Sequence, residues 1–238
     1  MRFPLVTVAA LLFAVLLAPS ARGLTIDNFE EGDFLVTDPG SPAAATSAEQ
    51  SGLLTSNVLG GVRLVRATAG GGTAANVATA ALTTTGLDDS VLLSHVGVNT
   101  DSTFVFIYDG VAGGTANNSA GTLNLDLSAA LSIDITATAP VGGAHARVIL
   151  WTSTTSQGTA FDPLVNGVTS FPLSTFGLLN LADIRQIQVT ISDVSAANAV
   201  AVTHIEAVGG VVVPEPSTGL LVGLGLFGLA VGRRRSEV

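Results

Sequence analysis

The sequence predicts an all-β protein with a β-sandwich body, flanked by an apolar helix at each end of the chain. Three observations support this prediction. Apolar and polar residues alternate with a period of two in several short stretches, clusters of Gly, Asn, Asp and Pro separate these stretches, and helical periodicity is scarce. Two apolar segments lie outside the body, at residues 5–17 and 218–232. We therefore divide the 238 residues into a signal peptide (1–23), a β-sandwich domain (24–210) and a C-terminal sorting segment (211–238).

The first segment has the three parts of a secretory signal peptide. Arg2 supplies a positive charge, an apolar stretch of 13 residues follows at 5–17, and small residues come next. Cleavage between Gly23 and Leu24 fits the small-residue rule of signal peptidase, and cleavage after Ser20 is the alternative. An uncleaved anchor is a second interpretation, although the stretch is short for a membrane span. We expect export through the Sec translocon.

The strands of the body are predicted one by one from local patterns. The clearest have apolar residues at every second position, and they are residues 122–127, 132–136 and 187–192. Residues 104–108 and 148–151 are apolar on both faces, so we predict central strands there, with Trp151 in the core. Weaker strand signals occur at residues 25–29, 33–36, 61–68, 91–96, 168–173 and 199–208. With one helical turn expected at 178–183, about ten short strands joined by turns predict a sandwich or jelly roll.

The charge of the body is strongly negative. Its lysine and arginine residues are four arginines, namely Arg63, Arg66, Arg147 and Arg185. Its acidic residues are the 18 of the chain less Glu215 and Glu237, so the net charge is 4 − 16 = −12. Such a surface repels nucleic acid, which we exclude as a partner. The chain has no cysteine, so the body must be stable without disulfides and has no thiolate chemistry.

No catalytic motif is present in the sequence. The three histidines are isolated, no HExxH or GxSxG sequence occurs, and the chain has no lysine for a phosphate-binding loop. We therefore predict no catalytic residue and a body that is not an enzyme. A glycoside hydrolase or lyase with paired carboxylates is the alternative that sequence alone leaves open.

Acidic residues gather at the first predicted strand and recur on the last. Asp27, Glu30 and Asp33 are close in sequence, and Glu206 lies on a strand that often pairs near the first one in a jelly roll. Carboxylate oxygens are ligands for Ca²⁺, so these four residues are candidates for a calcium site. The alternative is a solvated acidic edge that prevents aggregation between sheets.

The C-terminal segment has three parts in a fixed order. It begins with the motif Val213, Pro214, Glu215, Pro216. The two prolines hold the residues before them extended. An uncharged apolar run at 218–232 follows, which as a helix would reach roughly 22–25 Å against a hydrocarbon core of ~30 Å. The run ends at Arg233, Arg234 and Arg235, which can reach the cytoplasmic interface and orient the body outward. A plain linker before a tail anchor is the alternative.

These three parts together resemble the PEP-CTERM sorting signal of Gram-negative bacteria. The resemblance covers about a tenth of the chain, and all three parts stand in order at its end. It implies that an exosortase, an integral membrane enzyme, recognises and removes the tail after transient anchoring in the inner membrane. It also implies a body delivered to the cell surface or the extracellular space, among exopolysaccharide and biofilm matrix.

A second resemblance concerns the body. Residues 25–32 (Thr-Ile-Asp-Asn-Phe-Glu-Glu-Gly), 180–189 and 202–206 resemble strands of jelly-roll carbohydrate-binding modules. This resemblance implies the sandwich fold and makes polysaccharide binding, with calcium as a candidate cofactor, the alternative function. Sugar sites usually use exposed aromatic rings, and the body offers few of these: Trp151, Tyr108 and seven phenylalanines.

Overall fold

The computed structural model describes most of the body of the chain. The described residues are 23–40, 45–70, 76–84, 89–97, 101–113, 121–138, 143–152, 157–196 and 199–209. The two predicted terminal helices, the sorting motif and the arginine cluster lie outside them. Within the described ranges, no helix has the length and apolar character needed to cross a membrane.

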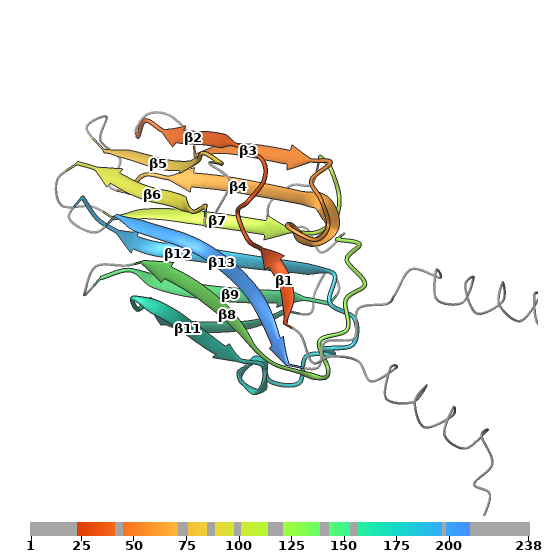
Figure 1. The fold of residues 1–238 in the computed structure, drawn as a ribbon. Helices are drawn as coiled ribbons and strands as arrows, with labels where there is room; N and C mark the ends of the chain where they lie inside the picture. The colour runs from red at the N-terminus through yellow and green to blue at the C-terminus, as the bar shows by residue number, and fades with distance from the viewer. Residues whose placement is uncertain are drawn as a thin grey trace, which may run out of the picture.

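Two antiparallel sheets make up the structure (Figure 1). The seven-stranded sheet has the order β11 (Gly167–Pro172), β8 (Ala130–Thr138), β13 (Val200–Gly209), β6 (Val91–Val96), β5 (Val77–Leu82) and β2 (Phe34–Asp38), with β1 (Leu24–Asp27) beside β13. The six-stranded sheet has the order β10 (Gln157–Pro163), β9 (His145–Trp151), β12 (Gln186–Val194), β7 (Ser102–Tyr108), β4 (Val62–Thr68) and β3 (Thr46–Ser51). Two short 3-10 helices, Leu59–Gly61 and Leu173–Phe176, accompany the strands.

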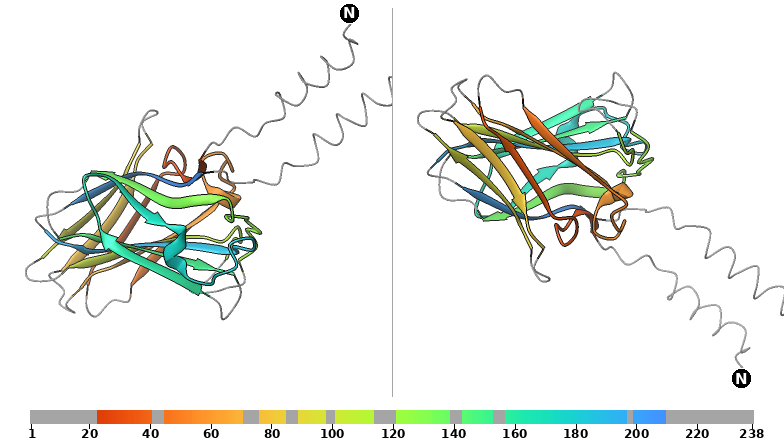
Figure 2. Two further views of the ribbon diagram at one scale, coloured as in Figure 1. Left: turned by 90° about the horizontal axis from the view of Figure 1, so that it is seen from below. Right: turned by 90° about the horizontal axis from the view of Figure 1, so that it is seen from above.

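The core lies between the two sheets, which Figure 2 shows from the side. Every second side chain of each strand points inward, as the pleat requires. On β7 the inward residues are Phe104, Phe106 and Tyr108, all fully buried. The ring of Phe29, from the β1–β2 connection, packs edge-on against Phe106 with 5.8 Å between ring centres. The prediction of an all-β sandwich is confirmed.

The predicted strands agree with the structure where the apolar pattern is strong. Residues 91–96 form β6 with the predicted bounds, and nine further predictions overlap β1, β2, β4, β7, β8, β9, β11, β12 and β13. Three strands were not predicted: β3, β5 and β10. β3 is almost entirely polar, β5 is rich in alanine, and β10 contains Gly158 and Pro163, so none of them carries a clear β signal.

Two local predictions are wrong. Residues 122–127 form no regular strand, because their pairing is limited to isolated contacts such as the bridge between Leu125 and Ile184. Residues 178–183 form turns and not a helical turn, and the 3-10 helix lies just before them at Leu173–Phe176. Backbone hydrogen bonds between these two irregular segments, such as Leu127 N–H to the Leu181 carbonyl at 2.7 Å, replace regular pairing.

The two ends of the described body lie side by side. β1 pairs with β13 in a register that sets Leu24 opposite Ala207 and Thr25 opposite Glu206. This confirms the expectation that the last strand lies next to the first. Gly23 and Gly209, the first and last described residues, are therefore at the same end of the sandwich (Figure 2).

Candidate functional site

The outer face of the six-stranded sheet carries the side chains of that sheet that point away from the core. On β12 these include Gln186 and Gln188, because Ile187 between them is buried in the core. The strand register sets Gln186 opposite Trp151 of β9, and Gln188 opposite Ile149. Two amides, an indole and an apolar side chain thus lie together on this face, near the end of the sheet where β12 begins and β9 ends.

Several polar side-chain atoms of Gln186, Gln188 and Trp151 are buried and have no hydrogen-bond partner among the described residues. Gln186 is fully buried and Gln188 is 7 % exposed. Both amide atoms of Gln186, the amide oxygen of Gln188 and Nε1 of Trp151 lack a partner among the described residues. A buried polar atom left unpaired costs about 1–3 kcal/mol, and most such atoms in folded proteins have a partner in protein, water or ligand. The described residues leave the hydrogen-bonding capacity of these atoms unused.

An exposed aromatic ring lies on the same face at the edge strand β10. Phe161 is 57 % exposed and stacks on the imidazole of His145, with 5.0 Å between ring centres and 12° between ring planes. His145 is held in turn by Asp193, whose carboxylate lies 2.8 Å from Nδ1. The pair offers a flat aromatic surface of the kind on which apolar sugar faces pack.

The prediction that Trp151 lies in the core is wrong. Trp151 is partly buried on the outer face, and it does not belong to the core between the sheets. Ile149, two residues earlier, also points outward and is only 6 % exposed. Residues 148–151 are therefore apolar on both faces of the strand because an outward-pointing side chain, Ile149, is buried as well.

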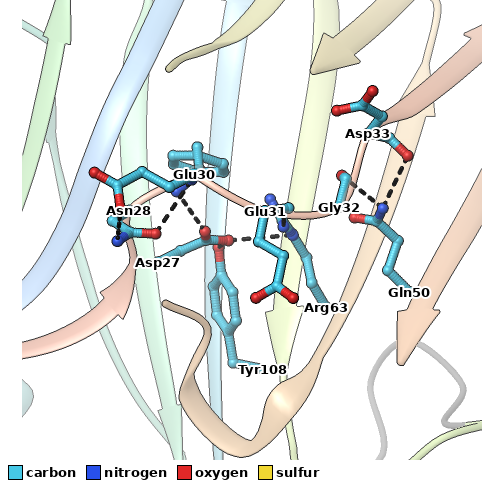
Figure 3. A network of polar contacts seen from close by, with 10 residues as sticks. Asp27, Asn28, Glu30, Glu31, Gly32, Asp33, Gln50, Arg63 and Tyr108 are labelled. Atoms are coloured by element: carbon cyan, nitrogen blue, oxygen red, sulfur yellow. Dashed lines mark hydrogen bonds and ion pairs between the residues drawn. The ribbon is translucent and has the colours of Figure 1, made fainter. Parts of the chain in front are cut away.

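A second polar group, formed by Asp27, Arg63 and Tyr108, is buried between the sheets (Figure 3). Nε of Arg63 lies 3.3 Å from Oδ2 of Asp27, and both side chains are fully buried. The Tyr108 hydroxyl donates to the same oxygen at 2.9 Å, and the backbone N–H of Phe29 donates to Oδ1 at 2.9 Å. Arg63 also donates to the carbonyl of Glu31. This buried cluster fastens the β1–β2 connection to β4 and β7.

Burial controls the ionisation of this cluster. It raises the pKa of Asp27 to about 6, against the opposing effects of the Arg63 guanidinium, the Phe29 N–H and the Tyr108 hydroxyl. It also raises the pKa of the Tyr108 hydroxyl well above its ordinary value. Nη1 of Arg63 has no hydrogen-bond partner among the described residues, but the guanidinium lies 5.3 Å from the ring centre of Phe29. The positive charge is thus balanced by a carboxylate and an aromatic ring.

The acidic residues near β1 that we considered as calcium ligands are engaged separately. Asp27 is the partner of Arg63. Asp33 accepts hydrogen bonds from the hydroxyl and the N–H of Thr84, and these bonds lower its pKa. Glu30 is exposed and accepts a hydrogen bond from its neighbour Asn28 at 3.0 Å.

Glu206 lies on β13 opposite Thr25, with its carboxylate 3.7 Å from Nε2 of His204. In the part of the chain that the structure describes, no three His, Cys, Asp or Glu side chains are grouped so that they could hold a metal ion. Calcium binding stays a prediction, and thermal unfolding with and without a chelator would test it.

A polar cleft of about 370 Å³ lies where the β1–β2 connection meets β13. Its lining residues are Asn28, Glu30, Asp89, Thr203 and His204. Of its two carboxylates, Glu30 is exposed, whereas Asp89 is buried and has interaction partners of its own. The cleft is therefore acidic and suits a neutral or cationic ligand better than an anionic one.

The sequence analysis did not identify Arg63 in the buried cluster, or Gln186 and Gln188 on the outer face, as candidate functional residues. For Arg63 a signal existed, because Val65 and Ala67 continue its side of β4 and are apolar, which places Arg63 on the inner face. For Gln186 and Gln188 the alternation gave the outward direction correctly. Nothing local in the sequence indicated that this outer face is itself covered.

Residues 212–235 match the PEP-CTERM protein-sorting motif. The match spans the Pro-Glu-Pro sequence, the apolar run and the arginine cluster, which are the three parts identified from the residues. The chain therefore carries a sorting motif of the class that marks exported proteins for an exosortase at the membrane. More particularly, that motif is of the PEP-CTERM kind and begins three residues after the last described residue of β13. No curated protein matches the chain.

Several solved structures share a similar architecture at low sequence identity. One is the family 11 carbohydrate-binding module of the cellulosomal cellulase Lic26A-Cel5E of Clostridium thermocellum, with 13% identity, a TM-score of 0.40, and coverage of 80% of this chain and 96% of that one. A carbohydrate-binding module of the β-sandwich superfamily has 11% identity and a TM-score of 0.33, covering 76% of this chain and 60% of that one. The enzymatically active domain of tailspike protein 4 of bacteriophage CBA120 has 10% identity and a TM-score of 0.33, covering 82% and 22%. None of these values supports a transfer of binding or activity.

Proposed function

We propose that the protein is a non-catalytic component of the cell surface or extracellular matrix, released from the inner membrane when an exosortase cuts its tail. The observation that carries this proposal is the sorting motif at residues 212–235. The signal-peptide pattern at the other end supports it, because both point to export. The absence of any recognised catalytic motif in the sequence supports a binding or structural role for the body.

The intact mass of the protein in culture fluid and in membranes tests the sorting step. The expected mature form begins near Leu24 and ends within or just after the Pro-Glu-Pro sequence at 214–216, without the apolar run at 218–232. A released form that keeps this run would contradict removal by an exosortase. Recovery of the whole chain from the cytosol would contradict export altogether.

Glu215 is the one charge in the extended segment between the sandwich and the apolar run. Glu215→Ala is therefore expected to slow tail removal, because a cutting enzyme that binds the motif in extended form loses its charged contact. Glu237→Ala is the matched control, since Glu237 lies beyond the arginine cluster. Equal processing of both variants would show that Glu215 is not recognised.

We propose further that the body binds a polysaccharide through the outer face of the six-stranded sheet. The specific observation is the set of buried and unpartnered groups of Gln186, Gln188 and Trp151. Sugars present many hydroxyl groups, which both donate and accept, and a planar amide matches them in the same way. The Phe161–His145 stack adds an aromatic surface on the same face, at the opposite end of β9 from Trp151.

Affinity gel electrophoresis on the cell's own exopolysaccharide tests this binding function. The protein is expected to be retarded, and Gln188→Leu is expected to abolish most of the retardation. Thr37→Val, on an exposed position of β2 in the other sheet, is the control and should migrate like the original chain. No retardation of the original chain on this polysaccharide would end the proposal.

A further inference from the structure

We propose that the polysaccharide bound by the outer face of the six-stranded sheet is anionic, and that Arg66 and Arg147 pair with its acidic groups. This inference rests on the binding function proposed above and names the chemical class of its ligand. It is drawn from the positions of the arginines in a body that is otherwise acidic.

Both arginines point outward from the same sheet. On β4, Val65 and Ala67 lie in the core, so Arg66 between them points to the outer face. On β9, Val148 is in the core, and its neighbour Arg147 is exposed on the outer face.

The strand register aligns the two arginines in one row across the sheet. Arg66 lies opposite Val105 of β7, Val105 opposite Thr190 of β12, and Thr190 opposite Arg147. The row ends at Phe161 of β10, which lies opposite Arg147. Three steps of ~4.8 Å between strands put the two arginine backbones about 14 Å apart. A polymer lying across the strands can reach both.

These two arginines are the ones that the protein leaves unpaired. Arg63 forms an ion pair with Asp27, and Arg185 forms one with Asp183. Among the residues that the structure describes, neither Arg66 nor Arg147 has an ion-pair or hydrogen-bond partner. Half of the body's arginines are therefore free, and both stand on one face.

The carboxylates beside this row are occupied. Glu49 on β3 accepts the N–H of Gly113 at 2.8 Å. Asp193 on β12 is paired with His145 at 2.8 Å. A hydrogen bond holds each carboxylate in place but does not cancel its charge, so the attraction for an anion comes from the two guanidinium groups themselves. The rest of the body, with a net charge of 4 − 16 = −12, repels it.

The other sheet has no such feature. None of the four arginines of the body lies on a strand of the seven-stranded sheet. Its large exposed side chains include Leu35, Leu92 and Val96, which are 70 %, 48 % and 64 % exposed. Among the described residues, the outer face of the six-stranded sheet is where guanidinium groups, amide atoms without a partner and a stacked ring occur together. Guanidinium forks match carboxylate or sulfate groups, and the amides match sugar hydroxyls.

The test uses the full chain purified in mild detergent and two pairs of polysaccharides. The pairs are polygalacturonate and its full methyl ester, and alginate and its ester, so that charge is removed while the sugar backbone stays. We expect retention on the acidic member of at least one pair and much weaker retention on its ester. Added salt should weaken the acidic complex, because it screens exposed charges.

The variants Arg66→Gln and Arg147→Gln test the assigned residues. Each is expected to weaken binding to the acidic polymer roughly threefold and the double variant roughly tenfold, as for exposed charge-assisted contacts. Arg185→Gln removes an arginine that is already paired and is the matched control, with unchanged binding. Circular dichroism and thermal unfolding check that all three variants stay folded.

The outcomes separate this inference from the function on which it rests. Equal retention on acid and ester, with no effect of the arginine variants, overturns the anionic ligand while polysaccharide binding stands. Retention on neither member of either pair overturns the anionic ligand, whereas polysaccharide binding itself is decided by the gel that contains the cell's own exopolysaccharide. Equally strong retention on double-stranded DNA would overturn the proposal that the ligand is a polysaccharide, because the arginines would then bind any polyanion.

Discussion

Two groups of buried polar side chains in this sandwich differ in how their hydrogen-bonding capacity is used. Inside the core, Asp27, Arg63 and Tyr108 bond to one another and to the backbone. On the outer face of the six-stranded sheet, Gln186 and Gln188 are almost as buried, and both amide atoms of Gln186 and the amide oxygen of Gln188 have no partner among the described residues. The first group pairs its charges internally, although Nη1 of Arg63 has no hydrogen-bond partner among the described residues, and it serves the fold. The second keeps a capacity that only something outside the described chain can use.

The largest change in stability is expected for a substitution of Arg63, in the core group. Arg63→Met leaves the carboxylate of Asp27 buried without its counter-charge, so we expect a loss of about 3–5 kcal/mol in the free energy of unfolding at pH 7. Urea unfolding followed by circular dichroism measures this loss. The control is Arg66→Met on the same strand, whose side chain points outward and should cost below ~1 kcal/mol.

A second change distinguishes a lost ion pair from lost packing. Combining Arg63→Met with Asp27→Asn removes both charges, and part of the lost stability should return because no buried charge is left alone. If the double variant is as unstable as the sum of the two single variants, the two side chains do not act as a pair.

The next effect concerns pH. The pKa of Asp27 is 3.8 in its ordinary state and about 6 in the folded body. Between these values the folded state keeps a proton that the unfolded state has released. The contribution of Asp27 to stability is therefore complete below pH 3.8 and is lost as the pH rises through 6. A shift of about 2 pKa units corresponds to ~3 kcal/mol.

Asp27→Asn isolates this contribution from the other acidic residues. We expect the stability of the original chain, measured relative to this variant by urea unfolding, to fall by about 2–3 kcal/mol between pH 4 and pH 7.5. A difference that does not change with pH would show that Arg63 keeps Asp27 ionised throughout, and the interior cluster would then be a plain ion pair.

A feature of the fold or the candidate site could be predicted from the sequence where it depends on residues that are close together in the chain. The sorting motif and strands such as β6 and β8 depend on neighbouring residues, so their patterns were readable. The pairing of Asp27 with Arg63 joins residues of different sheets, and no local pattern shows it. Trp151 was misplaced for a related reason, because its outward-pointing neighbours on this face are buried as well, and the local sequence does not show this.

The third effect has the opposite sign from the first. Gln188→Leu removes a buried amide oxygen that has no partner, together with a 3.3 Å hydrogen bond from Nε2 to the Thr190 hydroxyl, so stability should stay equal or rise by up to about 1 kcal/mol while polysaccharide binding is lost. Gln50→Leu is the matched control: its Nε2 donates to the carbonyls of Gly32 and Asp33 at 2.6 and 3.0 Å (Figure 3), so stability should fall. A clear loss of stability in Gln188→Leu would show that this amide stabilises the fold, as the Asp27–Arg63–Tyr108 cluster does.

The smallest expected change in stability is at the aromatic stack. Phe161→Ala removes a ring that is 57 % exposed on an edge strand, and such a ring contributes at most ~1 kcal/mol to the fold through its contact with His145. Retention on polysaccharide should nevertheless fall severalfold, because a stacking surface at the end of the arginine row is lost. Thermal unfolding and affinity electrophoresis on the same samples measure the two effects. Because this side chain adds so little to stability, a severalfold loss of binding at an unchanged melting temperature would show that the outer face binds a ligand. Unchanged binding would show that Phe161 does not contact the ligand and that the site consists of the amides.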